Sequence, residues 1–276
     1  MSEIKKTVKK LVSIVPPRNR RAASPAISMV IITAVTITLV LISTNYANQT
    51  LERQRAVSEF TTVKESIVAF DDAVRAVAFG TDAARSVRFS LAYGAMQLIP
   101  SNRSYTISAD GCPGASYTTD SGIIQYSMPT SLMTLGNNYQ NYFLGNSSLA
   151  VSSTAQTVGQ AKTTQVTGSV NMLLSYRVRA MLEGPSILVG SQSVNYVDIS
   201  LIRLNITRTV MQHTDFDLVA RNAAIHTTTS QIYSITGNTV TISVECDGVH
   251  EDVVIPLPSS GQVVFNFIVS DVKVSP

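Results

Sequence analysis

The hydrophobic pattern changes twice along the chain. Residues 26–43 are almost uniformly apolar, residues 60–77 carry apolar side chains at helical spacing, and from about residue 86 apolar and polar positions alternate. A long apolar run and a 3.6-residue period indicate helix, whereas a period of two indicates strands. The chain is therefore predicted to be α+β, with a long N-terminal hydrophobic α-helix followed by an all-β, sandwich-like C-terminal domain.

The apolar run is long enough to cross a membrane. As a helix, residues 26–43 would extend ~27 Å at about 1.5 Å per residue, close to the thickness of a bilayer hydrocarbon core. Thr33, Thr36 and Thr38 lie within it. We expect their hydroxyls to donate to carbonyls one turn earlier, which would leave no unsatisfied donor in lipid.

The stretch that follows is amphipathic. Charged residues occupy the faces away from an apolar stripe, which consists of Phe60, Val63, Ile67, Phe70, Val74 and Val77. No Pro or Gly occurs between Ala26 and Phe79, which predicts one continuous helix that ends near Gly80, a residue that tolerates the left-handed conformation. We expect this stripe to pack on the chain's own β domain. The earlier apolar run has no domain of its own to bury it, so we expect it to pack on partners.

The alternating region contains many predicted strands separated by turn residues. The strands are expected near residues 87–93, 105–107, 123–126, 166–182, 194–210, 218–228, 231–235, 239–245, 252–257 and 262–274. Asp120-Ser121-Gly122 is predicted to form a hairpin turn, and so is Gly237-Asn238. The stretch from Gly136 to Gly168 is rich in Thr, Ser, Gly and Asn, which predicts a domain boundary or a surface loop.

Charge is distributed unevenly around the apolar run. Seven basic residues and only Glu3 as an acid lie within residues 1–21, and no charged residue occurs between Arg21 and Glu52. The positive-inside rule therefore predicts a cytoplasmic N-terminus and an exterior C-terminal region. Without residues 1–22 the chain would lose seven of its 21 basic residues and one of its 18 acidic residues. The remainder has 14 basic and 17 acidic residues. That mildly acidic remainder gives no reason to expect nucleic-acid binding.

The boundary between the basic segment and the apolar run carries a resemblance to a known family. Ser24 suits a helix N-cap and Pro25 the first helical position. The order Arg21, Ala22, Ala23, Ser24, Pro25 ahead of the apolar helix resembles the class III signal peptide of archaeal type IV pilins. In that family a prepilin peptidase cuts before the hydrophobic segment, which implies cleavage between Ala22 and Ala23.

The resemblance implies an organisation for the whole chain. Residues 1–22 would be a basic leader peptide, 23–82 a helix for the membrane and later the filament core, and 83–276 an exported β-rich domain, subdivided near 136–168. Its partners would be prepilin peptidase, other pilin subunits and, before assembly, the cytoplasmic membrane. After assembly the protein would lie in a cell-surface filament. Packing in that filament would use Ile27, Val30, Ile31, Val35, Leu39 and Ile42.

Other interpretations of the N-terminus stay open. Asn45-Tyr46-Ala47-Asn48 is a poor version of an ordinary secretory cleavage site. An uncleaved anchor would instead hold an extracellular β domain that binds glycans, envelope proteins or motor proteins without polymerising. A third and weaker hypothesis is an anchored hydrolase.

Few residues suggest covalent chemistry. Cys112 and Cys246 would both face an oxidising exterior, where they either form a disulfide or remain two buried apolar residues. Asn102, Asn146 and Asn205 each begin an N-glycosylation acceptor triplet, and so does Asn48 close to the membrane end of the helix. Asn146 lies in the most loop-like surroundings.

Catalytic motifs are absent from the sequence: it has no Walker loop, dinucleotide fingerprint, zincin helix or nucleophile elbow. Two compact groups of potential metal ligands occur, His213 with Asp215 and Asp217, and residues 247–252 with His250. Both are expected to be solvated loops. We therefore expect neither an enzyme nor a bound cofactor or metal.

Overall fold

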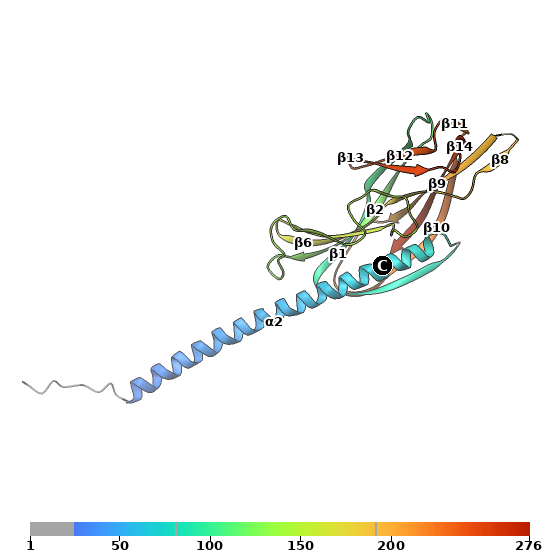
Figure 1. The fold of residues 1–276 in the computed structure, drawn as a ribbon. Coiled ribbons are helices and arrows are strands. Elements are labelled where there is room, and N and C mark those ends of the chain that lie inside the picture. The colour runs from blue at the N-terminus through green and yellow to red at the C-terminus, as the bar shows by residue number, and fades with distance from the viewer. Residues whose placement is uncertain (1–24, 81, 191) are drawn as a thin grey trace, which may run out of the picture. The chain divides into compact units, whose positions relative to one another are not determined.

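The computed structural model describes residues 25–80, 82–190 and 192–276 and has one long helix followed by a large β-sheet domain (Figure 1). The α+β class predicted from the hydrophobic pattern is therefore confirmed. Contacts divide the chain into two compact units, Met1–Leu51 and Glu52–Pro276. The division falls within the helix.

The helix α2 comprises Pro25–Ala78, as expected from a stretch without an internal Pro or Gly. The threonines behave as predicted: the hydroxyls of Thr33, Thr36 and Thr38 donate to the carbonyls four residues earlier at 2.8, 2.7 and 2.9 Å. The expected left-handed stop at Gly80 is wrong, because the positive φ belongs to Asp82 (55°). Gly80 instead donates its N–H to the carbonyl of Val77 at 3.1 Å.

Fourteen strands follow the helix in the described part of the chain. Their bounds are β1 Ala84–Ala109, β2 Ser116–Pro129, β3 Gln140–Leu144, β4 Ala150–Val151, β5 Gly159–Val166, β6 Ser169–Tyr176, β7 Val178–Leu182, β8 Ile187–Val189, β9 Gln192–Ile206, β10 Thr209–Thr229, β11 Tyr233–Ile235, β12 Thr239–Cys246, β13 Val249–Pro256 and β14 Gly261–Ser275. They pair in the order β3-β5-β6-β2-β1-β10-β14-β9-β7-β4, while β11 joins β14, β8 joins β9, and β13 joins β12, which joins β1.

The sheet folds over itself because β1 pairs with different strands at its two ends. Its first part, residues 84–98, is antiparallel to β10, and its last part, residues 105–109, is antiparallel to β12. Two hydrophobic cores result. One lies between the second part of α2 and the strands that include β1, β2, β6 and β10. The other lies between the end of β1 with β12 and the strands β7, β9 and β14, which gives the domain its sandwich character.

The stripe predicted to cover the β domain does so. Its six side chains, Phe60 to Val77, are between 0 and 7% exposed, and all belong to the first core. Phe70 meets the ring of Phe89 edge-on, with centroids 6.4 Å apart. Burial of large apolar side chains contributes about 1.5–3 kcal/mol each, so this stripe is a main source of attachment between helix residues 60–77 and the sheet.

The predicted hairpin at Asp120-Ser121-Gly122 is wrong, because β2 runs through these residues. Ser121 is buried, and its hydroxyl accepts the N–H of Leu204 at 3.1 Å. A Cβ atom on Gly122 would overlap the side chain of Ile206. Glycine is required here by the close approach of another strand rather than by a turn.

The stretch from Gly136 to Gly168 is not simply a loop or boundary. It contains β3, β4 and β5, and β5 pairs with both β3 and β6 inside the sheet. The face of β5 that carries Gly159, Ala161 and Thr163 is buried, and Gln160 is buried on the opposite face, so no large apolar residue signals a strand. Gly237-Asn238 does connect two strands, but β11 and β12 pair with β14 and β13 rather than with each other.

Candidate assembly interface

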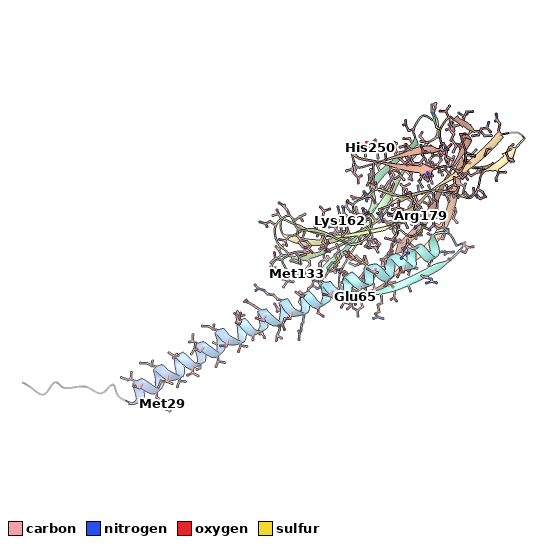
Figure 2. All side chains as sticks on the ribbon, viewed as in Figure 1. Met29, Glu65, Met133, Lys162, Arg179 and His250 are labelled. Atoms are coloured by element: carbon pink, nitrogen blue, oxygen red, sulfur yellow. The ribbon has the colours of Figure 1, made fainter. Side chains whose placement is uncertain are left out.

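The first part of α2 is apolar on every face and is not covered by the protein. The six residues predicted for filament packing are between 52 and 68% exposed: Ile27, Val30, Ile31, Val35, Leu39 and Ile42. Residues on the remaining faces are equally exposed, among them Met29, Ile32, Ile37, Val40 and Leu41. Figure 2 shows side chains standing out all around this part of the helix, beyond Met29.

Such a surface requires an apolar environment. Contiguous exposed apolar surface of this extent is rare in soluble monomers and indicates a membrane or a partner. A helix that is apolar all round is typical of a membrane span or a core helix. The segment is long and apolar enough to cross a bilayer, so α2 is a candidate membrane anchor near the N-terminus.

The structure describes only one of the five residues predicted to direct processing. Arg21, Ala22, Ala23 and Ser24 lie outside the described residues. Pro25 is the first described residue of α2.

The second part of α2 is held by a carboxylate that sequence reasoning missed. Glu59 accepts the backbone N–H groups of Ala92, Tyr93 and Gly94 at 2.8, 2.9 and 2.9 Å. It also accepts the hydroxyl of Tyr126 at 2.8 Å, and burial together with this carboxylate raises the pKa of Tyr126. The three consecutive amides are available because the register of β1 against β10 shifts between Leu91 and Ala95. Hydrogen bonds to a charged acceptor are worth about 1.5–3 kcal/mol, so Glu59 fixes this turn of the helix on β1.

The last turn of α2 is capped by side chains from distant strands. Asn222 of β10 donates its amide to the carbonyl of Val77 at 3.2 Å and also to that of Ala78. Ser270 of β14 donates its hydroxyl to the same Ala78 carbonyl. The last carbonyls of a helix have no partner within the helix, so these two buried side chains satisfy groups that would otherwise be costly to bury.

A buried carboxylate lies on α2 between Glu59 and the capped end of the helix. Asp71 is fully buried and accepts Arg75 Nε at 2.8 Å, while no described residue donates a hydrogen bond to its other oxygen, Oδ1. A Cβ atom on Gly159 would overlap this carboxylate, so β5 approaches α2 as closely as its backbone allows. Burial raises the pKa of Asp71, and the charge of Arg75 opposes that shift.

The two cysteines do not form a disulfide. Both are buried free thiols in the second core. Cys246 lies opposite Tyr105 in the β1–β12 ladder, whereas Cys112 follows Ala109, which lies opposite Ile242. The Tyr105–Cys246 pair and the Ala109–Ile242 pair lie four residues apart along the ladder, which is about 13 Å at roughly 3.3 Å per residue. The two cysteines are therefore too far apart for a disulfide. Burial raises the pKa of Cys246 to about 11, so the thiol is the stable form.

The predicted glycosylation acceptors are all exposed, including Asn102, Asn205 and Asn146. Only Asn146 takes part in a described side-chain network. Its Oδ1 accepts the backbone N–H and the hydroxyl of Ser148 at 3.1 and 2.7 Å, and also Arg177 Nη1. These contacts all use the oxygen, and within the described residues the amide nitrogen, the atom that a glycan would be attached to, makes no hydrogen bond.

The expectation that both groups of potential metal ligands lie on loops is wrong, because His213, Asp215 and Asp217 lie on β10 and residues 250–252 lie on β13. His213 Nδ1 is 2.6 Å from the carbonyl of Ala92, whereas Asp215 faces Arg88 at 3.5 Å. His250 faces Asp252 at 3.0 Å, and the neighbouring Glu251 accepts the N–H of Leu149. Among the residues that the structure describes, no three His, Cys, Asp or Glu side chains come together as a metal site would require.

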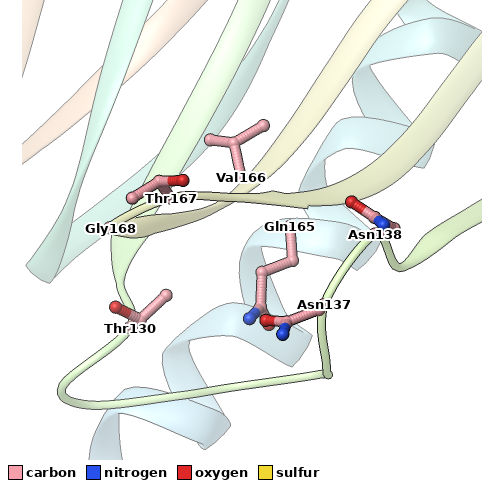
Figure 3. A pocket seen from close by; sticks show the side chains of 7 residues that line it. All are labelled: Thr130, Asn137, Asn138, Gln165, Val166, Thr167 and Gly168. Carbon is pink, nitrogen blue, oxygen red and sulfur yellow. The ribbon is translucent and has the colours of Figure 1, made fainter.

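A hollow of about 670 Å³ on the β domain lies at the β5–β6 turn (Figure 3). Polar, uncharged residues line most of it, among them Thr130, Asn137 and Thr167. Gln165 Oε1 accepts the N–H groups of Leu135 and Gly136 at 2.6 and 3.0 Å. Gln165 therefore holds the loop that forms one wall, which explains the hollow as a feature of loop structure.

Comparisons with known proteins add no assignment. No protein-family model matches the chain, and searches of curated proteins and of solved structures found no similar protein.

Proposed function

We propose that the chain is the precursor of a structural subunit of an archaeal type IV pilus-like surface filament. The observation that carries the proposal is the first part of α2, where 25 residues from Ile27 to Leu51 contain no charge and expose apolar side chains on all faces. A chain that only needed attachment to its β domain would have one apolar stripe, as residues 60–77 do.

The proposed mechanism has three steps. The basic N-terminal segment keeps residues 1–21 in the cytoplasm while the β domain is exported. Prepilin peptidase then cuts between Ala22 and Ala23 and leaves the helix on the mature protein. Finally, the helix moves from the cytoplasmic membrane into a bundle of helices from other subunits, with the β domain on the filament surface.

The transfer from lipid to a helical bundle requires close packing. Lipid tails are as apolar as leucine, so burial of apolar area alone does not favour the bundle over the membrane. Association depends on van der Waals contact between helices, and the small residues Ala34 and Ser43 in this segment allow neighbouring backbones to approach. The threonine hydroxyls are already bonded to their own helix and do not oppose the move.

The mature N-terminus tests this proposal. We expect mass spectrometry of the protein from its native membrane and from sheared surface appendages to find a chain that begins at Ala23. Replacement of Arg21 and Ala22 together should block this maturation, whereas replacement of Arg18 alone, three residues earlier, should leave it intact.

Three results would contradict the proposal: an intact N-terminus, a chain that begins after Ala47, or normal maturation of the Arg21 and Ala22 variant. If the full-length chain occurred only as single copies in membranes, the function would instead be that of an anchored β domain that binds glycans or envelope or motor proteins.

A further inference from the structure

A second cavity on the β domain has the features of a binding site that filament assembly does not use. It has a volume of about 240 Å³ and lies where β1, β5 and β6 meet the β12–β13 turn. Its lining includes the buried polar residues Gln160 and Ser175 and the apolar residues Ile123, Leu149 and Leu173. Apolar walls with a few fixed polar groups are typical of small-ligand sites.

The polar groups of this cavity are held in place before any ligand binds. Arg103 Nη1 donates to Gln160 Oε1 at 3.1 Å and to Ser175 Oγ at 3.0 Å. Arg103 Nε faces Asp247 at 3.3 Å, and the guanidinium lies 5.4 Å from the centre of the Tyr105 ring. Gln160 donates its own amide to the carbonyls of Asn146 and Ser148 at 2.6 and 3.3 Å. A cation fixed in this way loses little entropy when it binds an anion.

The cavity carries an excess of positive charge. Arg103 and Lys162 both line it, and Asp247 is the only acidic residue in its lining. Asp247 is already engaged, because one oxygen faces Arg103 and the other accepts the N–H of Ser104 at 3.3 Å. Within the described ranges, neither the Lys162 amino group on β5 (Figure 2) nor Arg103 Nη2 has a hydrogen-bond or ion-pair partner. Both are available to a negatively charged ligand.

We propose that this cavity binds an acidic sugar, a single saccharide residue that carries a carboxylate or sulfate group. Lys162 and Arg103 pair with the anionic group, and the side chains of Asn102 and Tyr142 bind hydroxyls at the rim. The apolar wall at Leu173 packs on the less polar face of the sugar ring. The volume is below the roughly 300–1,000 Å³ of sites for drug-sized molecules, which fits one sugar ring rather than an oligosaccharide.

Two sources of such a sugar are consistent with the position of the cavity. Asn102 and Ser147, which belong to two of the glycosylation triplets, both line it. A glycan attached to Asn102 or Asn146 would therefore begin at the rim and place an acidic residue inside. The other source is an acidic polysaccharide from the surroundings.

Binding of glucuronate tests the proposal on the full chain in detergent, produced in a host that does not N-glycosylate. We expect calorimetry to detect glucuronate binding that is weaker for glucose, and about tenfold weaker in Lys162→Gln, because a charge-assisted bond is lost. Lys273→Gln, which removes the same charge from an exposed position outside the cavity, should bind like the wild type.

The proposal fails if the wild type does not bind glucuronate, or if it binds glucose equally well. It also fails if Lys162→Gln and Lys273→Gln both bind glucuronate with the affinity of the wild type. Denaturant unfolding of both variants verifies that they are folded. Glucuronate binding does not depend on N-terminal processing. Failure of the cavity proposal would therefore leave the filament proposal intact, and failure of the filament proposal would leave the cavity proposal intact.

A second preparation distinguishes the two sources. If glucuronate binds more weakly to protein from an N-glycosylating host, the chain's own glycan occupies the cavity. Equal binding to both preparations assigns the site to external acidic polysaccharide.

Discussion

The two parts of α2 have the same backbone conformation but opposite surfaces. In residues 27–43 apolar side chains cover every face and remain exposed, whereas in residues 52–78 they form one buried stripe with charged residues around it. The distribution of charge accounts for the difference, because the first part has none and the second part has charged residues on its uncovered faces. One helix therefore carries two binding surfaces, one for its own domain and one for an outside apolar environment.

The buried stripe should dominate the stability of the β domain. Phe70→Ala removes a ring that is 1% exposed and meets Phe89, and such substitutions cost about 3–5 kcal/mol. We expect this loss in the free energy of unfolding, measured by denaturant titration of the full chain in detergent.

Val35→Ala is the matched control in the other part of the helix, since Val35 is 52% exposed. It should leave the unfolding of the β domain unchanged. If both substitutions lowered the free energy of unfolding equally, the two parts of α2 would not differ in their packing on the β domain.

Membrane insertion of the uncharged first part of α2 should depend on charge rather than on side-chain volume. Leu39→Arg places a cation near the middle of the apolar segment, at a cost of about 2.5–3.5 kcal/mol in membrane insertion. We expect a large drop in the fraction of protein that remains in membranes after alkaline extraction. Thr62→Arg, at an exposed position of the second part, should behave like the wild type. If both variants stayed fully inserted, residues 27–51 would not be the membrane-spanning segment.

The smallest expected effect concerns the buried carboxylate of the second part. Because the pKa of Asp71 is raised in the folded protein, the native state keeps a proton that the unfolded state has already lost. The wild type should therefore lose stability as pH rises from the ordinary aspartate pKa to the raised value. Asp71→Asn lacks this contribution, so its stability relative to the wild type should increase over that window and then level off. Parallel stability curves measured by denaturant titration at several pH values would contradict this assignment.

Local patterns predicted the helix, its stripe and most of the strands, because each depends on spacing within a short stretch. The residues that attach α2 to the sheet were not predictable in this way. Asn222 lies 145 residues from the carbonyl of Val77 that it caps, and Glu59 lies 33 residues from Ala92. Nothing around Glu59 in the sequence distinguishes it from the solvated acids on the same helix.

The errors in the β domain have the same physical origin. Gly122 resembled a turn residue, but its missing side chain makes room for Ile206 from a distant strand. The strand β5 resembled a loop because its buried positions are Gly, Gln, Ala and Thr. The cavity beside Lys162 brings together residues from Asn102 to Val249, and no sequence motif links them.

The position of β14 sets the order in which the domain can be completed. This last strand lies inside the sheet, antiparallel to β10 and parallel to β9. Among the described strands β14 is synthesised after its neighbours β10 and β9, so the centre of the sheet stays open until β14 is available. Pairing over such long sequence separations is intrinsically slow. The domain can therefore complete its fold only once β14 has paired with both β10 and β9.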